Sequence, residues 1–311
     1  MAACGSGDGG GDPNPDPTVI ARAGLPNGDG QNGTVAQPLA DSFRVVVTEG
    51  GAARSGVTVT WSTSTAGAVM NPGSSTTDAN GRAASRMTLG QVAGAQAARA
   101  SLTGPGFVIF GATASAGPAA KLEIVSGDDQ ASLASNALSL PLRVKVSDQF
   151  DNTINNSVVS WSVVSGTATL SGASSVTANG GVAAITVTVG GSPGPIQIRA
   201  VSVGQDTVTF DAHVVTLVKD VLVKNNFFES GSNGSQAPAV DTIPAGEAVR
   251  FVWQSATVEH NVIPQGPPLF LGVSGAIRSP FIHGPVRIAV PGTYNYDCNL
   301  HLGMSGVIVV Q

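Results

Sequence analysis

The run Val57-Thr58-Val59-Thr60-Trp61-Ser62 alternates apolar side chains with hydroxyl-bearing ones. Successive side chains of a β-strand point to opposite faces of its sheet, so this alternation predicts a half-buried strand. A second run of the same kind, Val159-Ser160-Trp161-Ser162-Val163, lies about 100 residues further along the chain. The recurrence indicates an internal repeat, and the apolar alternation places both Trp side chains in a core rather than on a ligand-binding surface.

Two further pairs of segments support the repeat. Arg44-Val45-Val46-Val47 matches Arg143-Val144-Lys145-Val146, and Asp78-Ala79-Asn80-Gly81-Arg82-Ala83 matches Thr177-Ala178-Asn179-Gly180-Gly181-Val182-Ala183. The Asn-Gly pairs between strand-like runs indicate tight turns, because both residues tolerate positive φ. Short strands, tight turns and one strand-centre Trp per unit are typical of an Ig-like β-sandwich. The two units resemble the bacterial Ig-like repeats of invasins and other surface proteins, although neither has the inter-sheet Cys pair of antibody domains.

The composition fits an all-β chain of two or three domains. Only 11% of the 311 residues are charged and 40 are Gly, which favours short strands and turns over helices. The net charge of −5 is spread thinly, and no basic patch indicates a nucleic-acid partner. No apolar run reaches about 18 residues, so no membrane-spanning segment is predicted.

The predicted boundaries give a tail and three domains. Residues 1–17 are rich in Gly, Asp and Pro, cannot bury a core and are expected to be disordered. Two Ig-like sandwiches are expected over 18–117 and 118–216, with the first junction at Ala116-Gly117-Pro118-Ala119. A third domain is expected over 217–311, in which residues 221–228 are predicted to form one strand and residues 264–268, Pro-Gln-Gly-Pro-Pro, a loop.

The tail contains one of the two cysteines. Ala2-Ala3-Cys4-Gly5 resembles the cleavage site of a bacterial lipoprotein, which implies a lipid on Cys4 and an anchor that does not span the membrane. The match departs from the pattern, because Met1 stands where Leu is usual and no apolar signal region precedes it. An unmodified, exposed Cys4 is the alternative, and a Cys4–Cys298 disulfide is a third one, which would leave good metal ligands unused.

The C-terminal residues carry a pattern of metal ligands. Cys298, His301 and Met304 are spaced C-x2-H-x2-M, and His260 lies 38 positions before Cys298. One thiolate, two imidazoles and a thioether form a donor set that suits copper. Zinc prefers four strong ligands, and iron–sulfur clusters need more cysteines than the chain has. One copper ion per chain is therefore predicted, whereas His213 and His283 fall outside the pattern.

Residues 217–311 resemble a cupredoxin of the plastocyanin/amicyanin kind. Besides the ligand loop, the matching segments are Ile243–Trp253, His260-Asn261-Val262 and Pro291-Gly292-Thr293-Tyr294, in the order of that family. The resemblance implies a Greek-key β-sandwich with a type 1, or blue, copper site that carries electrons. It also implies that Asn261 tethers the Cys loop and tunes the sulfur. Redox partners would dock on apolar residues near the loop, namely Leu300, Leu302, Pro267 and Pro268.

The expected function is thus electron transfer by a copper domain carried on Ig-like spacers, periplasmic or at the cell surface, with transient protein partners. Copper storage or delivery is one alternative, although no Met- or His-rich run supports it. Surface adhesion through residues 18–216, with an accessory copper domain, is another. An enzyme is not expected, because four His cannot build additional copper sites and no G-x-S-x-G or H-E-x-x-H motif is present.

Overall fold

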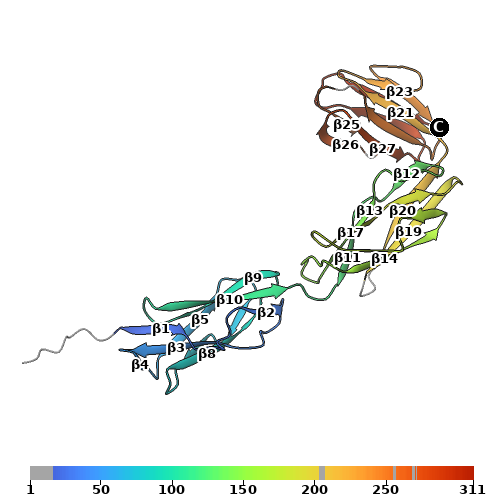
Figure 1. The fold of residues 1–311 in the computed structure, drawn as a ribbon. Coiled ribbons are helices and arrows are strands. Elements are labelled where there is room, and N and C mark those ends of the chain that lie inside the picture. Colours follow the sequence, from blue (N-terminus) through green and yellow to red (C-terminus); the bar gives the residue numbers. More distant parts are fainter. Residues whose placement is uncertain (1–16, 203–206, 255–256, 268–269, 271) are drawn as a thin grey trace, which may run out of the picture. The chain divides into compact units, whose positions relative to one another are not determined.

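The computed structural model describes all residues except 1–16, 203–206, 255–256, 268–269 and 271. Every regular element in the described part is a β-strand (Figure 1). No helix among these residues has the length and apolar character needed to cross a bilayer. The predicted all-β class, with Ig-like sandwiches, is confirmed. The chain divides into two compact units, Met1–Pro118 with Asp148–Asn152, and Ala119–Ser147 with Thr153–Gln311.

The first sandwich lies in the first unit and has two sheets. One has the order β1-β3-β8-β6, with β4 beside β3, and the other has the order β2-β10-β9-β5-β7. The strands are β1 Thr18–Arg22, β2 Gln31–Thr34, β3 Phe43–Glu49, β4 Ala52–Ala53, β5 Thr58–Thr63, β6 Val69–Asn71, β7 Ser74–Thr76, β8 Arg82–Thr88, β9 Gly94–Ser101 and β10 Phe107–Ser115.

The second sandwich repeats this plan in the second unit. Its sheets have the orders β11-β13-β17 and β12-β20-β19-β14-β16, and β15 pairs with β18. The strands are β11 Lys121–Ser126, β12 Gln130–Leu133, β13 Leu142–Ser147, β14 Val158–Ser165, β15 Ala168–Leu170, β16 Ser174–Val176, β17 Val182–Ile185, β18 Val187–Val189, β19 Gly194–Ser202 and β20 Thr207–Val215.

The C-terminal sandwich, also in the second unit, packs the sheet β22-β21-β24-β27 against the sheet β23-β29-β28-β25-β26. The pairs β21–β24 and β23–β29 are parallel, and the other named pairs are antiparallel. The strands are β21 Val218–Val223, β22 Phe228–Ser230, β23 Ala239–Ile243, β24 Ala248–Trp253, β25 His260–Gln265, β26 Val273–Ile277, β27 Phe281–Arg287, β28 Gly292–Asp297 and β29 Ser305–Val310.

The repeat-defining Trp residues lie in the cores, as predicted. Trp61 packs against Phe110 and Trp161 against Phe210, with ring centroids 6.1 and 5.9 Å apart. Both indoles are buried, and each donates its Nε1–H to a hydroxyl fourteen residues later, Ser75 or Ser175. The repeat therefore preserves a polar partner for the indole as well as the apolar alternation.

One predicted turn is confirmed, whereas the bounds of a predicted strand and a predicted loop differ in the structure. The turn at Asn80-Gly81 is confirmed, with Gly81 at φ 69° and its N–H donated to the carbonyl of Asp78. The strand predicted over 221–228 instead starts at Val218 and ends at Val223, because the chain turns back to form β22. Pro264 and Gln265, predicted to lie in a loop, belong to β25 and pair with β28. Proline's missing N–H is tolerated in such a strand only where the ladder does not need that donor.

Candidate metal centre

Strand register brings the distant ligands to one end of the C-terminal sandwich. β25 runs antiparallel to β28, with Ile263 opposite Asp297. His260 precedes this pair on β25, and Cys298 directly follows the last residue of β28, so both lie beyond the same end of the ladder. His301 and Met304 then belong to the short loop that joins β28 to β29. Alternation of side chains on β28 turns Cys298 inward with Tyr294 and Tyr296, which are also buried.

Backbone hydrogen bonds fix the shape of the ligand loop. The N–H of Cys298 donates to the carbonyl of Met304 at 2.9 Å, which closes the loop at its base. The N–H groups of His301 and Met304 each donate to the carbonyl three residues earlier, at 3.3 Å. Gly303 adopts a φ of 81°, a conformation that a residue with a Cβ disfavours. The loop is therefore a tight turn set by its own backbone.

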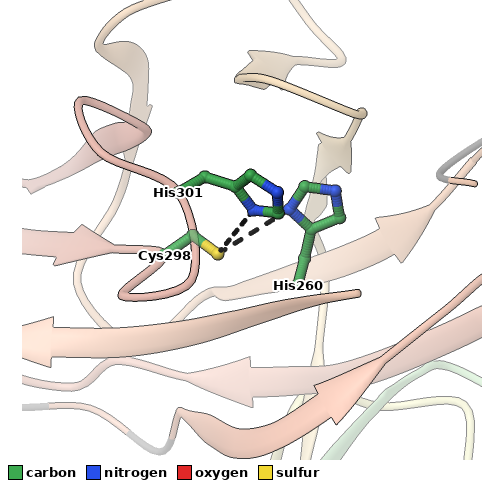
Figure 2. A group of neighbouring side chains, drawn as sticks. All are labelled: His260, Cys298 and His301. Carbon is green, nitrogen blue, oxygen red and sulfur yellow. Dashed lines mark hydrogen bonds between the residues drawn. The ribbon is translucent and has the colours of Figure 1, made fainter. Parts of the chain in front are cut away.

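The thiol and the two imidazoles converge on a common point (Figure 2). Cys298 Sγ lies 3.7 Å from His260 Nδ1 and 3.7 Å from His301 Nδ1, and the three donor atoms lie within 4.8 Å of one another. A metal about 2.0–2.1 Å from nitrogen and about 2.3 Å from sulfur, with an angle of about 120°, separates the two donors by about 3.7–3.8 Å. The observed spacing fits one small metal ion held by all three groups.

The donors sit at the boundary between core and solvent. His260, Cys298 and Met304 are buried, and His301 is partly exposed. The structure thus brings together the three predicted nitrogen and sulfur donors, and it places Met304 in the same buried apolar cluster as Cys298. Met304 closes the same loop through its carbonyl, so its thioether belongs to this end of the sandwich.

Burial and, as a smaller effect, the charge of the neighbouring His301 together lower the pKa of His260 to about 4. The imidazole of His260 is therefore neutral near pH 7, the form in which its Nδ1 can bind a metal. Its other nitrogen, Nε2, is buried and has no hydrogen-bond partner among the described residues.

Two asparagines tie the two ligand segments together. Asn261 Nδ2 donates to Asn299 Oδ1 at 2.6 Å, and the Asn299 N–H donates to Asn261 Oδ1 at 3.1 Å. The backbone N–H of Asn261 also points at Cys298 Sγ, 3.5 Å away. Asn261 was predicted to tether the Cys loop, whereas the role of Asn299 was missed. Its place directly after Cys298 was the only sequence signal that could have indicated it.

A shallow hollow of about 290 Å³ lies beside the ligand loop and is lined by polar and apolar residues, among them Gln265, Asp297, His301 and Leu302. Of the residues predicted to dock a partner, Leu300, Leu302 and Pro267 are exposed. Pro268 and Cys4 lie outside the described residues. His283 on β27 and His213 on β20 are not part of the three-donor group.

Comparison with known proteins identifies no family for the chain. No protein-family model matches it, and no curated protein matches it. Among solved structures, the adhesin FdeC of Escherichia coli is similar, with 16% identity over 94% of this chain and 96% of that chain and a TM-score of 0.45. Invasin, a bacterial integrin-binding protein, has 14% identity over 95% of this chain and 60% of that chain, with a TM-score of 0.31. A three-Ig-domain fragment of titin has 14% identity over 95% and 99%, with a TM-score of 0.31.

These findings correct the predicted family. Membership of the cupredoxins was wrong, and the plastocyanin-like, blue-copper and electron-transport assignments that came with it fall too, because the similar structures are Ig-like domains of adhesins and titin. The resemblance rested on a few short segments. Such segments fix the spacing of donors and the shape of one loop, whereas a family is defined by the whole sandwich. The geometry of the donors does not depend on the family name.

Proposed function

We propose that the C-terminal sandwich binds one copper ion per chain through His260, Cys298, His301 and Met304. The observation that carries the proposal is the convergence of one thiol and two imidazole groups, with each Nδ1 atom 3.7 Å from Cys298 Sγ. We further propose that the protein is exported and displayed at the cell surface or in the periplasm, where Ig-like sandwiches carry this domain, with protein partners and with Cys4 as a lipid attachment site.

The donor set favours copper over other metals. Thiolate and thioether are soft ligands that suit copper, and the two imidazoles complete a donor set for that metal. Zinc prefers four strong ligands, and the thioether of Met304 is a weak one. When bound, copper supplies a one-electron couple between its cuprous and cupric states. The chain's own contribution is to keep the imidazole of His260 neutral, to shield the sulfur from water and to hold both ligand segments through the Asn261–Asn299 pair.

Copper titration of the full chain tests the proposal. Binding should saturate at one equivalent and produce a thiolate-to-copper absorption in the visible spectrum, because sulfur bonded to cupric copper absorbs there. Cys298→Ser should remove the absorption. His283→Ala, a control outside the three-donor group, should leave it unchanged. An absorption that persists in Cys298→Ser would refute the ligand assignment.

Copper storage or delivery would use the same residues and requires an exchangeable ion. The two uses differ in how fast the ion leaves. A chelator should remove copper slowly from a site whose ligands are buried and fixed by the backbone, whereas release within seconds would favour delivery.

Adhesion through the first sandwich is a second candidate, and a specific surface favours it. Phe107 and Ile109 on β10 are about half exposed, and the guanidinium of Arg99 lies over the Phe107 ring, 4.2 Å from its centroid. The second sandwich has Thr207 and Thr209 at the corresponding register positions, opposite Val201 and Arg199. Aromatic residues and Arg are enriched in protein interfaces, so this surface suits a protein partner.

Cells that display the chain test this candidate. The test surface is coated with integrin, because invasin is an integrin-binding protein. Adhesion to it should fall in the Phe107→Thr and Ile109→Thr variants and should be unchanged in Cys298→Ser. Adhesion that needs copper, or that survives both substitutions in the first sandwich, would contradict it.

A further inference from the structure

The loop Asp148–Asn152 belongs by sequence to the second repeat and by its contacts to the first sandwich. It joins β13 to β14, both strands of the second sandwich. Nevertheless the five residues form part of the first compact unit, together with Met1–Pro118. At the corresponding place after β3, the first repeat has Glu49-Gly50-Gly51-Ala52-Ala53, without an Asn or an aromatic residue.

Asp148 is the centre of the loop's polar contacts. Its carboxylate is fully buried, and Oδ2 accepts hydrogen bonds from the Gly117 N–H at 2.8 Å and from Asn152 Nδ2 at 2.9 Å. Oδ1 accepts from the N–H groups of Phe150 and Asn152, at 2.8 and 3.0 Å. Burial alone would raise the pKa of Asp148, but the hydrogen bonds, led by that of the Asn152 side chain, lower it on balance. A buried carboxylate with four donors is a fully satisfied group.

Asn152 and Phe150 extend the contact to two other parts of the first sandwich. Asn152 Nδ2 donates to the carbonyl of Gln91 at 2.7 Å, and the N–H of Ala93 donates to Asn152 Oδ1 at 2.7 Å. These partners lie in the connection between β8 and β9. Phe150 packs against the apolar core cluster that contains Trp61 and Phe110.

We infer that this loop is a clasp that completes the first sandwich with residues of the second repeat. The loop then holds three parts of the first sandwich together: Asp148 holds Gly117, Asn152 holds the Gln91–Ala93 connection, and Phe150 packs on the core. The first sandwich depends on the clasp for part of its protection against local opening, so its stability is set by sequence outside its own repeat. Local opening of this kind is measured by amide hydrogen exchange.

Hydrogen exchange of the full chain tests the clasp. Asn152→Ala leaves Asp148 in place as the acceptor for Gly117, yet it should speed exchange of the Gly117 amide at least tenfold, because the two bonds form one network. Asp148→Ala should do the same at the Ala93 amide, whose acceptor is Asn152. Gln149→Ala, an exposed residue of the same loop, is the matched control and should change neither amide.

The amides of Val144 and Val146 on β13 report whether the second sandwich stays folded. Their exchange should not change in any of the variants. Wild-type exchange rates at the Gly117 amide in Asn152→Ala and at the Ala93 amide in Asp148→Ala would overturn the proposed clasp. Acceleration at β13 equal to that at Gly117 would also overturn it, since the variants would then act by unfolding the second repeat.

Discussion

Met304 is the least certain by residue type of the four candidate ligands, because a lone buried Met usually only fills a core. Met304→Leu conserves most of the side-chain volume, so the free energy of unfolding should fall by less than about 1.5 kcal/mol. Copper should remain bound by the three stronger donors, and its midpoint potential should rise because the thioether is lost. A redox titration of the two proteins measures the difference. Met70→Leu in the first sandwich is the control, and an unchanged potential in Met304→Leu would show that Met304 does not bind the metal.

The buried carboxylate of Asp148 predicts a pH dependence for the first unit. The pKa in the folded protein lies below the ordinary value of 3.8, so the unfolded chain takes up the proton first. The stabilisation is therefore complete above that value and is lost as pH falls through the folded pKa. Urea unfolding at about pH 6 and at about pH 3 measures it. Asp148→Asn should reduce the loss of unfolding free energy between the two pH values. An equal loss of unfolding free energy in both proteins would contradict the prediction.

Single residues also show what the sequence could and could not predict at the candidate site. Cys298, His301 and Met304 share one loop, so their spacing alone indicated a common centre. His260 required a partner strand, and only the β25–β28 register explains why it meets the loop. The Asn261–Asn299 pair could not be derived, because an amide's partner depends on side-chain orientation across two segments rather than on spacing.

At the scale of strands, the two sandwiches provide an internal comparison for the buried indole. Trp61 Nε1 donates to Ser75 and Trp161 Nε1 to Ser175, whereas Trp253 Nε1 has no partner among the described residues. Ser75→Ala and Ser175→Ala should each cost about 1–3 kcal/mol, because a buried donor loses its acceptor. Denaturant unfolding measures the change, and exposed Ser62→Ala is the control. A loss no larger than that of the control would mean that water replaces the hydroxyl.

Strand β29 has a position where only Gly fits. A Cβ on Gly306 would overlap the Tyr296 ring and its hydroxyl, which lie directly across the β28–β29 pair. Gly306→Ala should therefore destabilise the C-terminal sandwich by about 2–3 kcal/mol, as overpacking of a core does. Gly275→Ala on β26, where the new methyl would make only ordinary contact, is the matched control. Equal unfolding midpoints for the two variants would contradict the prediction.

Strand prediction succeeded where alternation was regular and failed where a short polar turn separated two apolar segments. The alternating segments around Trp61 and Trp161 lie in β5 and β14. The segment 221–228 has no Gly or Pro, so the turn between β21 and β22 is indicated in the sequence only by the polar residues Lys224-Asn225-Asn226, of which Asn favours turns. Pro264 was predicted to lie in a loop, because a proline usually argues against a strand, but it belongs to β25.

For the whole molecule, the repeat predicted two similar sandwiches, but it could not predict how the chain divides into compact units. The loop Asp148–Asn152 lies inside the second repeat and yet forms part of the first unit. Such an exchange depends on contacts of Asp148, Phe150 and Asn152 with residues far away in sequence. Periodicity reports only which face of a strand is apolar, so it does not reveal these contacts.

Two compact units predict that copper stabilises one part of the chain and not the other. The proposed ligands all lie in the second unit, Ala119–Ser147 with Thr153–Gln311. A ligand that binds only the folded state at about 100 times its Kd adds about 2.7 kcal/mol. For a unit of this size, that raises the unfolding temperature by about 5–10 °C. Calorimetry of the full chain should therefore show one transition that moves with copper and one that does not.

Cys298→Ser separates specific binding from general effects of the metal in that calorimetric experiment. The variant keeps both units and loses the thiolate, so copper should no longer move the upper or the lower transition. A copper-induced shift in the first unit would place a site outside the proposed ligands. A shift that survives in Cys298→Ser would mean that the ion binds without the sulfur, and the three-donor centre would then be wrong even though its atoms converge.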